Sequence, residues 1–141
     1  MIALTPAQRD QMTAHGEQAY PHECCGFLIG TRREARKRVE AVRPAGNARE
    51  DSPQNRYLIS PEEMLRAERD ARRAGQEILG FYHSHPDVPA RPSPYDLDHA
   101  WPVYSFLIMA VHQGRATEMH SWVMVEDHSR FEEEELVVEE L

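Results

Sequence analysis

The sequence predicts a single α/β domain, spanning residues 1–141, in which helices flank a mixed sheet. Apolar segments with strand character interleave with segments that carry helix-capping signals, as in α/β proteins. Several strand segments are close neighbours in sequence, so antiparallel pairs should accompany parallel ones. A chain of 141 residues, 40% of them hydrophobic, has the size of one domain and enough apolar side chains for one core.

The first part of the chain should contain one helix followed by strands. Thr5 can cap a helix in which Pro6 takes the first position and Gln8 completes a capping box. This helix should run to about Ala19 and end before Pro21, because the residue preceding a proline disfavours the helical conformation. Strands are expected over residues 24–29, 38–42 and 56–59, with a loop over 44–54.

The central strand should follow a second helix. Ser60 caps this helix, which should end near Gly75. Residues 77–85 are a long and largely apolar segment, which is typical of a strand buried on both faces. Alternate side chains of the strand should share one face, namely those of Leu79, Phe81, His83 and His85.

The last part of the chain should contain a third helix and the remaining strands. Prolines in and around residues 87–92 forbid regular pairing and predict a loop. Ser93 then begins a helix that reaches about Trp101. Strands are expected over residues 104–111, 117–126 and 131–138, the last of them at an edge of the sheet.

The composition disfavours several classes of function. A net charge of −8 argues against nucleic acid as a partner, because phosphate binding needs a basic surface. The first residues lack the regions of a secretory signal, and the longest apolar run, 103–111, is about half a membrane span. Cys24 and Cys25 are adjacent, so they do not form a disulfide framework. We expect a soluble, cytoplasmic protein that binds neither nucleic acid nor membrane; its oligomeric state stays open.

Charged residues gather in two runs. The basic run consists of Arg32, Arg33, Arg36, Lys37 and Arg38, and the acidic run consists of Glu132, Glu133, Glu134, Glu135, Glu139 and Glu140. Each run fits a solvated loop or strand edge. The basic run could instead meet an acidic protein partner.

The motif that carries chemistry begins in the central strand. His83 and His85 point the same way from a strand, and Asp96 follows at the start of the predicted third helix. Two imidazoles and one carboxylate are the ligands that a catalytic zinc ion keeps while a fourth position stays open for water. Ser93 would cap that helix beside the metal, and Glu23, before a buried strand, is the best upstream candidate for a base.

These residues, with the phrases around them, resemble the JAMM (MPN-plus) zinc metallopeptidase family in its compact prokaryotic branch. The phrases are Pro21 to Gly30 and Gly80 to Pro86. The resemblance implies a curved α/β sheet flanked by helices, similar to cytidine deaminases. It also implies roles for five residues: His83, His85 and Asp96 would ligate Zn²⁺, Glu23 would act as the base for a water, and Ser93 would stabilise the oxyanion.

The same resemblance implies the substrate. The family cleaves peptide or isopeptide bonds after the C-terminal Gly-Gly of ubiquitin or ubiquitin-like proteins, which in the prokaryotic branch resemble sulfur carriers. The chain lacks room for the long insertions of eukaryotic deubiquitinases, so a small carrier protein is the expected partner. Its flexible tail would lie in a groove as an added strand.

Two other functions stay open at this point. The family also includes domains that only assemble complexes, so the chain could be a non-catalytic scaffold or a module that binds a carrier protein. Cys25 could serve, with a histidine, as the nucleophile of a thiol-dependent hydrolase, although packing in the core is its simpler role. A thiol nucleophile needs a neighbouring base and a lowered pKa, which a sequence does not reveal.

Overall fold

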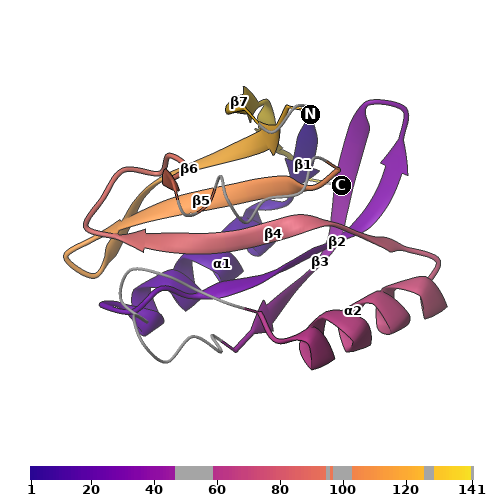
Figure 1. Ribbon diagram of the computed structural model, residues 1–141, viewed down its shortest axis with the longest axis horizontal. Coiled ribbons are helices and arrows are strands. Elements are labelled where there is room, and N and C mark those ends of the chain that lie inside the picture. Colours follow the sequence, from indigo (N-terminus) through magenta and orange to yellow (C-terminus); the bar gives the residue numbers. More distant parts are fainter. Residues whose placement is uncertain (47–58, 95, 97–102, 126–128, 141) are drawn as a thin grey trace.

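The computed structural model of the chain describes residues 1–46, 59–94, 96, 103–125 and 129–140. These residues form eight strands and two helices (Figure 1). The elements are β1 (Ile2–Leu4), α1 (Pro6–Ala19), β2 (Cys25–Arg33), β3 (Arg36–Ala45), α2 (Pro61–Arg73), β4 (Glu77–Pro86), β5 (Ser105–His112), β6 (Arg115–Met124), β7 (Phe131–Glu134) and β8 (Leu136–Val138).

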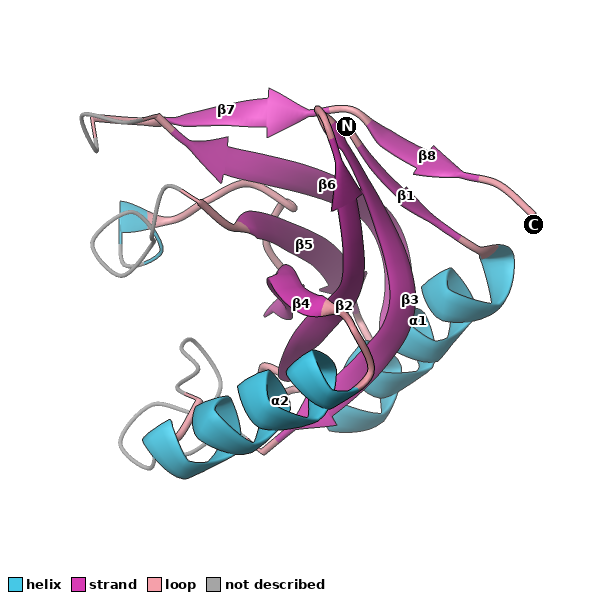
Figure 2. Cartoon of the chain, turned by 90° about the vertical axis from the view of Figure 1, so that its right-hand side faces the viewer, coloured by secondary structure: helices cyan, strands magenta, loops and turns pink. Residues whose placement is uncertain are grey.

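All the described strands join one mixed sheet with the order β7-β6-β5-β4-β2-β3-β1-β8. β4 pairs parallel with β5 and antiparallel with β2, so it lies inside the sheet as its apolar sequence predicted. β7 and β8 are the two ends of this order, yet only Glu135 separates them in sequence. The sheet therefore curls until its ends meet, and Figure 2 shows β7 leading directly into β8 along one side of the molecule. The predicted mixed α/β sheet is confirmed, and its curvature nearly closes a barrel.

The predicted starts of α1 and α2 are confirmed by their capping bonds. The Thr5 side chain accepts a hydrogen bond from the Gln8 N–H, and the Gln8 side chain accepts one from the Thr5 N–H, which completes the capping box of α1. The Ser60 side chain accepts from the Glu63 N–H at the start of α2. Neither helix among the described residues combines the length and apolar character needed to cross a membrane.

The sheet is covered on both faces. α1 contributes to a core cluster that includes Tyr82, and α2 contributes Ala67 and Ala71 to a second cluster that includes Phe81. Phe81 and Tyr82 are consecutive in β4, and consecutive strand residues point to opposite faces. The two helices therefore cover opposite faces, and β4 is buried between two cores.

A bulge interrupts the alternation of β4. Gly80 and Ile78 face consecutive residues of β2, so Leu79 is an extra residue between them. Leu79 packs in the core cluster of Tyr82, whereas Phe81 packs in the other cluster. The prediction that Leu79 shares a face with Phe81 is therefore wrong, while the register from Phe81 to the end of the strand is regular.

Both chain ends differ from the prediction. β1 was not anticipated, because three residues before a helix give no periodic signal; it pairs parallel with β3 and β8. The predicted edge strand over 131–138 is two strands, β7 and β8, which lie at opposite ends of the sheet order. Residues 56–58 of the predicted third strand, and most of the predicted helix after Ser93, lie outside the described residues.

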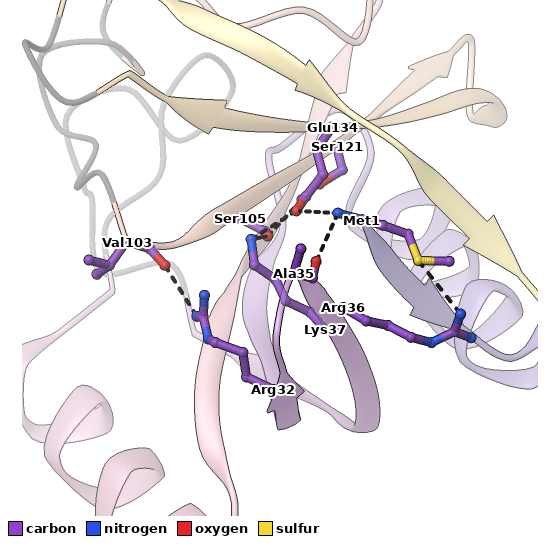
Figure 3. Close-up of polar contacts among 9 residues, drawn as sticks. All are labelled: Met1, Arg32, Ala35, Arg36, Lys37, Val103, Ser105, Ser121 and Glu134. Atoms are coloured by element: carbon purple, nitrogen blue, oxygen red, sulfur yellow. Dashed lines mark hydrogen bonds and ion pairs between the residues drawn. The ribbon is translucent and has the colours of Figure 1, made fainter.

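One residue of the basic run and one of the acidic run meet inside the curled sheet. Lys37 and Glu134 are each only 8% exposed, and Lys37 Nζ lies 2.8 Å from Glu134 Oε2 (Figure 3). The Oε1 atom of Glu134 accepts hydrogen bonds from the hydroxyls of Ser105 and Ser121, at 2.7 and 2.8 Å. These two charged residues therefore do not belong to a solvated edge, contrary to the simple interpretation of the runs.

Candidate metal centre

His83 and His85 lie at the end of β4 with both rings buried. The two residues are 1% and 6% exposed, and their Nε2 atoms are 3.1 Å apart. His85 Nδ1–H donates to the carbonyl oxygen of Pro89 at 2.9 Å, because a carbonyl can only accept. This bond leaves the Nε2 lone pair of His85 available on the side that faces His83.

The start of the next helical segment brings Asp96 to the two rings. The Ser93 side chain accepts from the Asp96 N–H at 3.1 Å, and Asp96 Oδ2 accepts from the Ser93 N–H at 2.8 Å. These reciprocal bonds form a cap that fixes the carboxylate. Asp96 Oδ1 lies 3.4 Å from His83 Nε2, and Asp96 Oδ2 lies 3.3 Å from His85 Nε2.

Glu23 joins the histidines from the residues that precede β2. It is 5% exposed, and its carboxylate lies with the rings of His83 and His85 in a group whose ligand atoms are all within 4.8 Å of one another. Two hydrogen bonds hold the backbone next to Glu23: Ser84 Oγ accepts from the Cys24 N–H at 2.9 Å, and the Ser84 N–H donates to the Cys24 carbonyl at 3.1 Å. Ser84 was missed in the sequence, although its place between two histidines of one strand could have indicated it.

Burial, and the attraction between the imidazole rings and the carboxylate, set the protonation states of His83, His85 and Asp96. Burial lowers the pKa of His83 below its usual range. Burial acts in the same direction on His85, but the carboxylate of Asp96 and the Pro89 carbonyl raise its pKa overall. Burial alone would raise the pKa of Asp96, but the two rings and the Ser93 N–H hold it well below its usual range. The carboxylate is therefore ionised at neutral pH.

The ligand atoms fit a small cation. In a tetrahedral site with bonds of about 2.0–2.1 Å, two ligand atoms lie about 3.3–3.4 Å apart. The separations among His83 Nε2, His85 Nε2 and the Asp96 oxygens are 3.1, 3.4 and 3.3 Å. A donor set of two imidazoles and a carboxylate suits a first-row divalent ion. The three side chains therefore lie close enough together to be candidate ligands of one cation, with Asp96 presenting a different oxygen to each ring.

The cysteines do not have the properties of a nucleophile. Cys25 is fully buried, at 0% exposed, and burial strongly raises the pKa of its thiol. Burial raises the pKa of Cys24 to about 11. A reactive cysteine needs exposure and a lowered pKa. The thiol-dependent hydrolase is therefore disfavoured, and Cys25 packs in the core cluster of α2.

Similarity to known proteins extends over most of the chain. A protein of Haloferax volcanii named Desampylase is 35% identical over 126 residues, which are 86% of this chain and 87% of that protein. A protein of Thermus thermophilus named "Probable TtuB-protein conjugate cleaving protease" is 38% identical over 91 residues, 64% of this chain and 57% of that protein.

The fold has a counterpart among solved structures. The crystal structure of a JAB1/MPN domain protein from Archaeoglobus fulgidus superimposes with a TM-score of 0.61 over 99% of this chain and 98% of that one. Because the sequences are only 18% identical, this likeness concerns the fold alone. The family described as prokaryotic homologs of the JAB domain matches residues 5–125. The match over residues 5–125, together with the 35% identity to the Haloferax protein, shows that the chain belongs to the family of prokaryotic homologs of the JAB domain.

Proposed function

We propose that this chain is a zinc metallopeptidase of the JAMM type that cleaves conjugates of a ubiquitin-like sulfur-carrier protein. The bond hydrolysed is the peptide or isopeptide bond after the carrier's C-terminal Gly-Gly. The observation that carries the proposal is the convergence of His83, His85 and Asp96 at tetrahedral ligand spacing beside the buried Glu23. The names of the relatives, Desampylase and a TtuB-protein conjugate cleaving protease, support the same class of substrate.

In this proposal His83, His85 and Asp96 hold the metal. When bound, zinc is a Lewis acid that makes a water nucleophilic at neutral pH. The Nε2 lone pairs and the ionised carboxylate are the forms that such an ion requires. The capping bonds between Ser93 and Asp96 keep the carboxylate pointed at the two rings, so the three ligands are preorganised.

Glu23 and Ser93 carry out the proton transfer and the charge stabilisation. Glu23 accepts a proton from the attacking water and passes it to the leaving amine. The Ser93 hydroxyl, which accepts the Asp96 N–H through its oxygen, keeps its own hydrogen for donation. That hydrogen is donated to the carbonyl oxygen of the substrate as negative charge develops there.

The expected partner is a small carrier protein whose extended C-terminal tail enters the site, as in the addition of a strand to a sheet. We place the activity in the cytoplasm, because two free cysteines suit a reducing compartment. A short tail of two glycines suits a site whose ligands are almost fully buried, since glycine lets the backbone approach closely.

The test uses a ubiquitin-like carrier extended beyond Gly-Gly by one amino acid, with cleavage followed by mass spectrometry. The zinc-loaded protein should release that amino acid, and removal of zinc with a chelator should abolish release. Glu23→Gln should lower kcat by about 10²–10⁴-fold while zinc content stays at the wild-type level, because an amide can neither accept nor deliver the proton. Full activity of a metal-free sample would overturn the proposal.

The same samples separate the enzyme from the non-catalytic alternative. If the chain is a scaffold or binding module, the wild type and Glu23→Gln should bind the carrier protein equally well. Neither of these two proteins should then cleave any Gly-Gly conjugate. An enzyme should show turnover in the wild type alone.

A further inference from the structure

The loop that follows β4 is held from β6 at a single residue, Ala90. The Ala90 N–H donates to Oε1 of Glu118 at 2.9 Å, and Nε1–H of Trp122 donates to the Ala90 carbonyl at 3.1 Å. Ala90 is 0% exposed and packs with Ile108 and Ala110, with Trp122 against them. Both polar groups of one loop residue are thus bound by side chains of one strand.

The same loop orients a ligand of the candidate metal centre. The carbonyl that accepts from His85 Nδ1–H belongs to Pro89, and the N–H that donates to Glu118 belongs to Ala90. These two groups are the two ends of one peptide unit. Because a peptide unit is planar and rigid, fixing its N–H also fixes its carbonyl. The Glu118 carboxylate is therefore connected to the His85 ring through a single peptide group.

Such a connection affects both the position and the electron density of the ring. A metal-binding histidine usually donates its second N–H to a carboxylate or carbonyl, which fixes its tautomer and raises its basicity. A hydrogen bond from an amide N–H to a carboxylate polarises the amide, so its carbonyl becomes a stronger acceptor. Here the carboxylate of Glu118 acts on the carbonyl that His85 uses.

We propose that Glu118 and Trp122 are positioning residues of the metal centre, acting through the Pro89–Ala90 peptide on His85. The proposal rests on the proposed function. Ala90 also precedes Ser93 by three residues, a reach of at most about 10 Å, so the same contacts limit where the segment that carries the cap can lie.

Glu118 permits a clean test because it lies exposed on β6, outside the core. Glu118→Ala removes the acceptor, whereas Glu118→Gln keeps an oxygen at the same place and removes only the charge. Trp122→Phe removes the indole N–H and keeps an aromatic ring. The control is Arg115→Gln, which removes an exposed charge at the start of the same strand.

The experiment measures three quantities for each variant: zinc affinity by competition with a chelator, kcat and KM on the Gly-Gly conjugate, and exchange of the Ala90 amide hydrogen in the metal-free protein. Glu118→Ala should weaken zinc binding by about 10–100-fold, the usual effect of losing a partner of a ligand. It should also lower kcat more than it raises KM, and speed exchange at Ala90. Glu118→Gln should retain most of the wild-type zinc affinity. Trp122→Phe should change the same three quantities in the same direction as Glu118→Ala, by smaller amounts.

The outcomes separate this proposal from the proposed function. A wild type without zinc binding or turnover would overturn the function, while exchange at Ala90 would still report whether Glu118 holds the peptide. A zinc-binding, active wild type with an equally active and equally tight-binding Glu118→Ala would overturn the positioning role alone. Equal losses in Arg115→Gln would also overturn it, because they would assign the effect to β6 in general.

Discussion

The buried ion pair of Lys37 and Glu134 leads to a specific prediction about the free energy of unfolding. Glu134→Gln removes one charge and leaves the Lys37 ammonium, which is 8% exposed, without its carboxylate. The hydroxyls of Ser105 and Ser121 would still have an amide oxygen to donate to. The change therefore removes the ion pair with Lys37 together with the longer one, at 3.5 Å, that the N-terminal ammonium makes with Glu134 Oε2.

Removing one partner of a buried pair costs about 3–5 kcal/mol. For a domain of 141 residues, this corresponds to a fall in Tm of about 10–17 °C. The double change Lys37→Met with Glu134→Leu should recover at least half of the loss, because apolar residues of similar volume often replace a buried pair without penalty. The control is Glu132→Gln, on the same strand. Glu132 also forms an ion pair at 2.8 Å, with Arg130, but this pair is exposed to solvent. The free energy of unfolding should therefore change by no more than about 0.5 kcal/mol.

Denaturant unfolding of the four proteins at neutral pH measures these differences, and acid titration adds a second check. Burial alone would raise the pKa of Glu134, but Lys37 and the two serines lower it overall. A lowered pKa means that the carboxylate adds stability above the unfolded value of about 4.3, and that this stability is lost as the pH falls further. The difference between wild type and Glu134→Gln should therefore be constant near neutral pH and shrink in acid. A loss under about 1 kcal/mol for Glu134→Gln, or a double variant no more stable than Glu134→Gln, would refute the reasoning.

Three further outcomes are expected. Gly80→Ala should destabilise the protein strongly, because a Cβ there would lie 2.0 Å from the backbone oxygen of Ser105 and would push β4 from β5; a native Tm would contradict this. Iodoacetamide at neutral pH should leave turnover intact, because burial raises the pKa of Cys24 to about 11 and Cys25 is fully buried; inactivation that follows alkylation would contradict this. Thr5→Ala should lower the free energy of unfolding by about 1 kcal/mol through loss of the cap of α1, whereas Thr5→Ser should restore it.

The parts of the fold that the sequence predicted are those with a local cause. The Thr5 and Ser60 caps depend on residues three positions away, and the burial of β4 depends on its own apolar run. The proposed metal-binding set belongs partly to this class. His83 and His85 share a face because a strand alternates, and Asp96 is tied to Ser93 by a cap of three residues.

The parts that the sequence did not predict depend on contacts between distant segments. Charge alone indicated solvent for Lys37 and Glu134, and only the curling of the sheet brings residues 97 positions apart together. β1 forms a strand because it pairs with β3 on one side and with β8 on the other. The role of Glu118 has the same origin, because its partner Ala90 lies 28 positions away.

The tripeptide of residues 83–85 shows how one local pattern organises a site assembled from distant parts. Alternation turns both imidazoles to one face of β4, and the same alternation turns Ser84 away from them. Ser84 then accepts the N–H of Cys24, the residue directly after Glu23. The strand that supplies two of the proposed metal ligands therefore also fixes the backbone that carries the proposed base. A change at Ser84 should separate Glu23 from the histidines without touching any ligand: Ser84→Ala should lower kcat while zinc affinity stays near the wild-type value, and a variant that loses both together would show that Ser84 supports the strand and not the placement of the base.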